Sequence, residues 1–156
     1  MLELQIPGGT HLRLSHLVLD FNGTLARDGE SLIGVAEKMA ELAHLLQLHV
    51  ITADTHGTVG RKLTGLPCSL KIIGPKGQDS QKETFVRSLG RQQVAAVGNG
   101  RNDGLMLKTA ELGIALVQEE GASVSAILQA DLVCTDILSA FDLLLSPRRL
   151  IATLRN

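Results

Sequence analysis

The sequence predicts an α/β fold in which a mainly parallel sheet is covered by helices on both faces, giving three layers. Short runs rich in Leu, Val and Ile recur along the chain, and segments of helical periodicity separate them. Such apolar runs are typical of strands that are buried on both faces. No linker, repeat or low-complexity tract interrupts the 156 residues. We therefore predict one doubly wound, Rossmann-like domain spanning residues 1–156.

The first residues predict a β-hairpin. An apolar run at 2–6 is followed by Pro7, Gly8 and Gly9, and the returning run at 11–20 continues into the first core strand. Six core strands are expected, at 16–20, 48–53, 69–73, 94–98, 113–117 and 131–134.

Helices are predicted between and after these strands. The spacing of apolar residues predicts a helix over 34–46, one that ends at Gly90, and one over 103–112 that closes at Gly113. Ser146 and Pro147 are typical of a helix start, so a short final helix is expected. The segment after the second strand contains Gly57 and Gly60, which lower its helical propensity.

Composition excludes several classes of function. Fifteen basic and sixteen acidic residues give a net charge of −1, and aromatic residues make up 2% of the chain, so a nucleic-acid partner is not expected. The N-terminal segment lacks the pattern of a signal peptide, and no apolar run approaches the roughly 18 residues that span a bilayer. Cys68 and Cys134 are interpreted as buried thiols. These features predict a cytoplasmic protein with no membrane partner.

Polar residues at the predicted strand ends indicate where chemistry would occur. Asp20 ends the first core strand, Thr52 the second, and Asp103 lies in the "GNGRND" segment after the fourth. Lys82 opens the helix before that fourth strand. Ligands of parallel sheets bind beyond the carboxyl ends of the strands, so we expect these groups at one rim. Two carboxylates that hold Mg²⁺, with a lysine and a hydroxyl for phosphoryl oxygens, suit phosphate chemistry.

Four segments in this order resemble the haloacid dehalogenase (HAD) superfamily of aspartate-nucleophile phosphohydrolases. They are "DFNGT" (20–24), "VITAD" around Thr52, "SQKETFVRSL" around Lys82 and "VGNGRNDGLMLKTAELGIAL" (97–116). The last segment is similar to the corresponding part of P-type ATPases, and the whole chain resembles the group called soluble P-type ATPase-like proteins. The resemblance implies a Mg²⁺-dependent phosphatase.

The resemblance also assigns residues to the metal and the nucleophile. Asp20 would become an aspartyl-phosphate and would ligate Mg²⁺. The carbonyl of Asn22 and the side chain of Asn99 would be neutral metal ligands, and Asp103 would hold the ion directly or through water. Asn22 would also occupy the catalytic position two residues after the nucleophile.

The same resemblance implies the phosphate-binding residues. Thr52 and Lys82 would bind the phosphoryl group, with Ala53 beside Thr52 and Asn102 near the phosphate. Lys82 would also belong to the catalytic set.

Two asparagines depart from the pattern of the superfamily. Asn22 replaces an Asp that acts as general acid and base, and Asn99 replaces an acidic metal ligand. An amide exchanges no proton near neutral pH, so a factor of about 10²–10⁴ in rate should be missing. We expect a slow phosphatase that favours good leaving groups; the alternative is an inactive phosphate- or Mg²⁺-binding regulatory module. A receiver-like signalling domain is disfavoured because its phosphorylated Asp follows the third strand.

The spacing of the motifs leaves no room for a cap domain. The intervals from Thr24 to Thr52 and from Thr52 to Lys82 are each used by about one helix and one strand. The expected substrate is a phosphorylated small molecule or a phosphoprotein. His56, in the loop after Thr52, is a candidate substrate contact. The apolar stretch at 140–154 is interpreted as helix packing or as the surface of a homo-oligomer.

Overall fold

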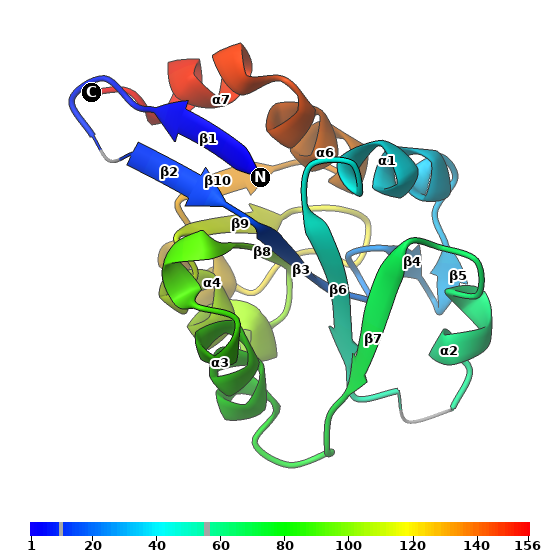
Figure 1. The fold of residues 1–156 in the computed structure, drawn as a ribbon. Helices are drawn as coiled ribbons and strands as arrows, with labels where there is room; N and C mark the ends of the chain where they lie inside the picture. Colours follow the sequence, from blue (N-terminus) through cyan, green and yellow to red (C-terminus); the bar gives the residue numbers. More distant parts are fainter. Residues whose placement is uncertain (10, 55–56) are drawn as a thin grey trace.

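The computed structural model describes residues 1–9, 11–54 and 57–156. At its centre is a parallel six-stranded sheet in the order β10-β9-β8-β3-β6-β7 (Figure 1). The predicted core strands are confirmed to within one or two residues at their ends. They are β3 (His16–Asp20), β6 (Gln47–Thr52), β7 (Cys68–Ile72), β8 (Val94–Gly98), β9 (Leu112–Leu116) and β10 (Leu132–Cys134).

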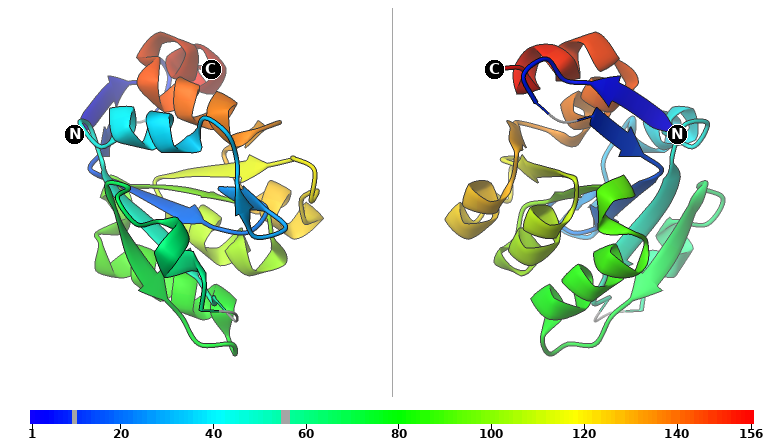
Figure 2. Two further views of the ribbon diagram at one scale, coloured as in Figure 1. Left: turned by 90° about the vertical axis from the view of Figure 1, so that its right-hand side faces the viewer. Right: turned by 60° about the vertical axis from the view of Figure 1, so that its left-hand side comes forward.

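Helices cover both faces of this sheet, which confirms the predicted three-layer architecture (Figure 2). One layer contains α3 (Gln78–Ser88), α4 (Gly104–Thr109) and α5 (Val124–Gln129). The other contains α1 (Val35–Leu42), α6 (Ile137–Leu145) and α7 (Pro147–Leu154). Short helical segments complete the set: α2 (Val59–Lys62) before β7, and 3₁₀ turns at Arg91–Gln93 and Arg101–Asp103. Each face of the sheet carries its own aliphatic core.

Two antiparallel hairpins flank the parallel sheet. β1 (Leu2–Gln5) pairs with β2 (His11–Leu14), as predicted, and β1 also contacts α7. A smaller hairpin of β4 (Ala26–Arg27) and β5 (Glu30–Ser31) follows β3 and was not predicted. Cys134 is buried, Cys68 is half-buried, and both thiols are free.

The predicted helix over 103–112 is wrong at its C-terminal end. The α4 helix ends at Thr109, Ala110 has an extended backbone, and Leu112 and Gly113 belong to β9. Gly113 therefore ends no helix. A Cβ at this position would lie against the carbonyl group of Leu107, closer than side chains are found to approach backbone. Gly113 is required by the close packing of α4 on β9.

One further helix prediction needs correction, and a weaker one is confirmed. The α1 helix ends at Leu42, four residues before the predicted end, although Leu46 is buried as its spacing indicated. The weaker helix expected in the segment around Gly60 is confirmed as the short α2 helix. The helix α5 was not predicted, and α6 was expected only in part, through the interpretation of the apolar stretch at 140–154 as helix packing.

Substitution of Gly113 by Ala is expected to lower the free energy of unfolding by about 1–3 kcal/mol, because the added methyl group must displace backbone. Urea denaturation measures this change. Gly60→Ala is the matched control, since its Cβ would make an ordinary contact 3.7 Å from Leu70 Cδ2. A loss at Gly113 no larger than that at Gly60 would contradict the packing explanation.

The order of the strands fixes the position of the site. β3 lies in the middle of the sheet; β6 pairs with it on one side and β8 on the other. The direction of winding reverses at this point, and a crevice forms where neighbouring connections leave a doubly wound sheet in opposite directions. The carboxyl ends of β3 and β8, which carry Asp20 and Asn99, lie at this crevice.

Candidate active site

A buried lysine lies between two carboxylates at the centre of the site. The Lys82 side chain, from α3, is 1% exposed. Its Nζ donates to Asp20 Oδ1 at 2.6 Å and to Asp103 Oδ1 at 2.6 Å. A buried ammonium is tolerated only when it is paired and hydrogen-bonded. The three residues therefore form one electrostatic unit that joins β3, α3 and the segment after β8.

This unit carries one more negative charge than positive charge. Burial raises the pKa of Asp20, and the nearby charge of Asp103 raises it further, while Lys82 opposes both effects. For Lys82, burial acts to lower the pKa, but the two carboxylates outweigh it and raise the pKa. A site that makes the ionised form of Asp20 costly favours a further cation.

Asp103 holds the loop that follows β8. Its Oδ2 accepts hydrogen bonds from the backbone amides of Asn99 (3.0 Å) and Gly100 (2.8 Å). With Oδ1 bound to Lys82, both carboxylate oxygens have partners, and the residue is fully buried. Asp103 therefore shapes the site from behind its wall.

The turn after β3 brings Asn22 to the cavity. The amides of Thr24, Leu25 and Ala26 converge on the Phe21 carbonyl at 3.2, 2.8 and 3.0 Å. Gly23 has a φ of +74°, and a Cβ there would lie within 3 Å of the Asn99 side chain. Only glycine permits both this conformation and this approach. The Asn22 side chain remains exposed beside Asp20.

Thr52 and Asn102 occupy the two sides of the site. Thr52 is buried, and its Oγ1 accepts a hydrogen bond from the Asp54 amide at 3.3 Å, so its hydroxyl can still donate. The Asp54 carboxylate accepts from the first amides of α2. Asn102 Nδ2 donates to Gln78 Oε1 at 2.7 Å. Amide and hydroxyl groups thus flank the central charges.

These groups surround one cavity of about 320 Å³. Seven of the eight residues singled out in the sequence line it: Asp20, Asn22, Thr52, Ala53, Lys82, Asn99 and Asn102. The eighth, Asp103, lies behind Lys82. The cavity is also lined by Asp54, Gln78, Gly100 and Glu120, which were not among the predicted site residues. His56 lies outside the described residues.

The residues of the site fit a hard divalent cation. Within the described ranges, no group of three or more His, Cys, Asp or Glu side chains is placed to hold a metal. The cavity instead offers the carboxylate of Asp20 and the amide oxygens of Asn22 and Asn99. Oxygen donors of this kind suit Mg²⁺. The uncompensated negative charge beside Lys82 supports the same fit.

A residue that the sequence did not reveal connects the turn after β3 to the rest of the fold. Gln118, after β9, donates from Nε2 to the carbonyl oxygens of Gly23 (2.9 Å) and Thr24 (3.0 Å). Its Oε1 accepts from the amide of Ile137 at 2.8 Å. One side chain thus joins the turn beside Asp20 to the start of α6.

Gln118→Ala is expected to lower the free energy of unfolding by about 2 kcal/mol, because three hydrogen bonds of about 0.5–1.5 kcal/mol each are lost and water replaces them in part. Urea denaturation measures the change. The control is Glu119→Ala, which removes only an exposed ion pair with Arg27 and should cost less than about 1 kcal/mol. Equal losses in the two variants would contradict the importance of Gln118.

Comparison with known proteins identifies a relative by sequence. No family model matches the sequence. The uncharacterized protein MJ0073 of Methanocaldococcus jannaschii is 49% identical over 65 residues, which is 42% of this chain and 70% of that protein. This identity and coverage show that the two chains belong to one family.

Solved structures share the fold at low sequence identity. The cobalt-bound deoxy-D-mannose-octulosonate 8-phosphate phosphatase of Haemophilus influenzae has a TM-score of 0.72 and 15% identity, covering 87% of this chain and 90% of that one. A HAD superfamily hydrolase from Legionella pneumophila has a TM-score of 0.68 and 18% identity, with coverages of 90% and 87%. These structures show that this chain has the fold of HAD superfamily hydrolases.

A second phosphatase with the HAD fold was crystallised with ligands. The 3-deoxy-D-manno-octulosonate 8-phosphate phosphatase of Moraxella catarrhalis, in complex with magnesium, phosphate and the sugar acid, has a TM-score of 0.66 and 18% identity. The match covers 91% of this chain and 94% of the Moraxella catarrhalis chain.

The likeness to P-type ATPases is partial. The cadmium/zinc-transporting ATPase HMA2 of Arabidopsis thaliana is 31% identical over 97 residues, which is 60% of this chain. This chain spans only about a tenth of that transporter's length. Among the described residues, no helix is both long enough and apolar enough to cross a bilayer. Between Thr24 and Thr52 the chain forms only β4, β5, α1 and β6, so this interval contains no cap domain.

Proposed function

We propose that this protein is a Mg²⁺-dependent phosphohydrolase that acts through an aspartyl-phosphate on Asp20. The observation that carries the proposal is the arrangement of Asp20, Lys82 and Asp103 at the reversal point of a HAD-type sheet. Support comes from the phosphatases of the same fold, one of which binds magnesium and phosphate.

In this proposal Asp20 attacks the phosphorus atom of a phosphomonoester. The bond to the leaving oxygen breaks, and the alcohol takes its proton from water, because the Asn22 amide has none to give. Water then attacks the same phosphorus and loses a proton to solvent, the bond between phosphorus and the Asp20 oxygen breaks, and inorganic phosphate leaves with the Asp20 carboxylate restored. Lys82 holds Asp20 in position, and the Thr52 hydroxyl, the Ala53 backbone and Asn102 bind the phosphoryl oxygens.

Asp20, the Asn22 carbonyl and the Asn99 side chain would hold Mg²⁺. Asp103 would support the ion through its charge and through the loop that it fixes, since it does not line the cavity. When bound, the ion supplies positive charge that stabilises the transferring phosphoryl group. The expected substrates are phosphorylated small molecules or phosphoproteins. A homo-oligomer stays a prediction.

The test is hydrolysis of p-nitrophenyl phosphate by the purified protein, with Mg²⁺ and with EDTA, beside the Asp20→Asn variant. We expect turnover only in the wild-type protein with Mg²⁺, because the variant has lost its nucleophile. Acid-quenched protein should also carry radioactive phosphate on Asp20 after incubation with a labelled substrate. Equal residual rates in all three arms would refute the proposal.

A second candidate is a non-catalytic module that binds phosphate and Mg²⁺. It is favoured by Asn22 and Asn99, which remove a proton donor and a negative charge from the cavity. This candidate predicts that beryllium fluoride, a phosphate analogue, still binds in the presence of Mg²⁺ while neither turnover nor phospho-aspartate is observed.

A further inference from the structure

The walls of the cavity carry negative charge on both sides of the phosphate position. In the order of the strands, Asn99 and Asp20 follow the central strands β8 and β3. Asp54 follows β6 on one side, and Glu120 follows β9 on the other, and both line the cavity. A bound phosphomonoester would therefore have its leaving group between two carboxylates.

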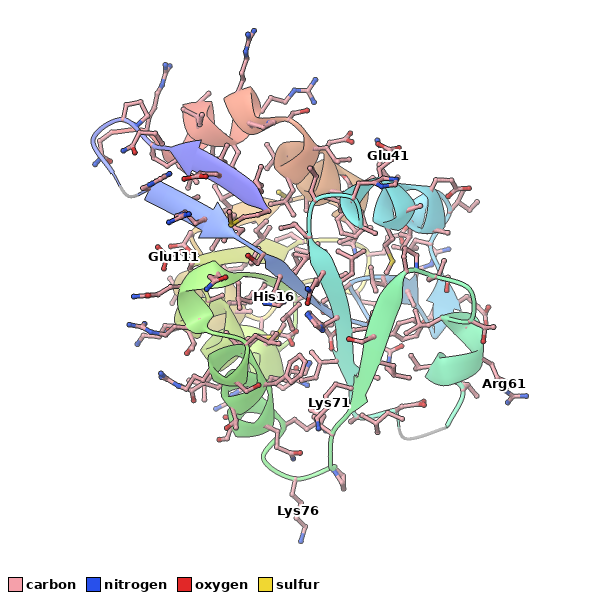
Figure 3. The ribbon with its side chains drawn as sticks, viewed as in Figure 1. His16, Glu41, Arg61, Lys71, Lys76 and Glu111 are labelled. Atoms are coloured by element: carbon pink, nitrogen blue, oxygen red, sulfur yellow. The ribbon has the colours of Figure 1, made fainter. Side chains whose placement is uncertain are left out.

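Within the described part of the chain, no cationic side chain other than Lys82 lines the cavity. Asp20 and Asp103 already share the charge of Lys82. Lys71 and Lys76 belong to β7 and the loop after it, but neither lines the cavity, and Figure 3 shows Lys76 pointing away from the molecule. A carboxylate or second phosphate on the substrate would meet like charge without a partner.

The remaining polar groups suit hydrogen-bond donors. Glu120 uses Oε1 to accept from the exposed amide of Asp28 at 3.0 Å and keeps its negative charge toward solvent. Asn102 Nδ2 donates a hydrogen bond to Gln78, and the Oδ1 of Asn102 can accept one. Hydroxyl and ammonium groups are the natural partners of such oxygens.

We propose that the site selects monophosphate esters of small non-anionic alcohols that carry hydroxyl or ammonium groups, and discriminates against esters that carry a second anionic group. This inference rests on the proposed phosphohydrolase function, since it concerns the leaving group in the same cavity. Its basis is like-charge repulsion in a partly desolvated cleft, where unfavourable juxtaposition of charges sets specificity.

The test compares two aryl phosphates of nearly equal size and leaving-group acidity. Phosphotyramine carries an ammonium group, and the phosphate ester of 3-(4-hydroxyphenyl)propanoate carries a carboxylate at the same distance from phosphorus. The assay contains Mg²⁺ and is run at pH 8, where an unperturbed histidine is neutral and adds no positive charge. Under these conditions we expect kcat/KM for phosphotyramine to be at least tenfold higher than kcat/KM for the carboxylate ester. The preference should shrink as salt is added, because exposed charges are screened.

Two variants locate the origin of the preference. Glu120→Gln should narrow the ratio of the two kcat/KM values at least threefold, because it removes one wall charge. Glu119→Gln is the matched control: this neighbour pairs with Arg27, does not line the cavity and should leave the ratio unchanged. An unchanged ratio of the two kcat/KM values in Glu120→Gln would show that the negative charge of Glu120 does not cause the preference.

The outcomes separate this inference from the proposed function. Equal hydrolysis of the two esters, or faster hydrolysis of the carboxylate ester, overturns the inference and leaves the phosphohydrolase intact. If neither ester is hydrolysed, the proposed function fails, and calorimetric binding of both esters to the wild-type protein with Mg²⁺ decides the inference. Tenfold tighter binding of phosphotyramine supports it, and equal affinities overturn it.

Discussion

Replacing Asn22 by Asp is expected to raise the turnover of p-nitrophenyl phosphate and, more strongly, of alkyl phosphates, by up to about 10²–10⁴-fold. The Asn22 side chain is exposed to the cavity beside Asp20, on a turn that Gly23 and Gln118 hold in place. A carboxyl group there can protonate the leaving oxygen and then accept a proton from the attacking water. Steady-state kinetics with both classes of substrate measure the gain.

The control for this variant is Asn22→Ala, which should have the turnover of the wild-type protein because neither side chain transfers a proton. Intact mass should be checked first, since the Asn22-Gly23 sequence is prone to deamidation. An unchanged or lower rate in well-folded Asn22→Asp protein would show that the asparagine is not what limits the reaction.

Replacing Lys82 by Met is expected to lower the free energy of unfolding by about 3–5 kcal/mol at pH 8, because Asp20 and Asp103 lose their shared cation. Urea denaturation measures the loss. The surface substitution Lys108→Met is the control and should change stability by less than about 0.5 kcal/mol.

The Lys82→Met protein should also become more stable as the pH falls from 8 to 5. In the wild-type fold the pKa of Asp20 is already raised from 3.8 to about 7, by burial first and by Asp103 second. Loss of the ammonium removes the main opposing effect and raises this pKa further. The folded state then binds more protons than the unfolded state across this range, so stability rises as the pH falls. A loss that is the same at pH 5 and pH 8 would contradict the assignment of the charge to Asp20.

Much of the fold could be predicted because local signals and tertiary structure agree. The strand β8 and the interior of β3, between His16 and Asp20, are apolar because helices cover both of their faces, and Ser146 and Pro147 mark the start of α7. The end of α4 could not be predicted, because Gly113 has the same appearance whether it ends a helix or admits a neighbouring backbone. The helix α5 has only six residues and lacks the two or three turns of clear periodicity on which such a prediction depends. The helix α6 does bury Ile137, Ala140, Phe141 and Leu144 at helical spacing, but further leucines between them obscure the pattern.

The candidate site, like the fold, could be predicted only in part. Asp20, Thr52 and Asn99 could be assigned to one rim because a single rule, that parallel strands end together, applies to all three. Gln118 and Glu120 could not, since their importance comes from meeting a turn about 95 residues earlier in the chain. No pattern along the sequence encodes such a meeting.

The burial of Lys82 between two acids makes the same atoms responsible for folding and for the proposed chemistry. A descendant of this protein that had lost all turnover would still need the ammonium, because its removal would leave two buried carboxylates without a cation. Persistence of Lys82 through evolution would therefore be expected for the stability of the fold even without catalysis. The exposed Asn22 side chain lines the cavity, so a substitution there could change the rate of the reaction with little effect on the stability of the fold.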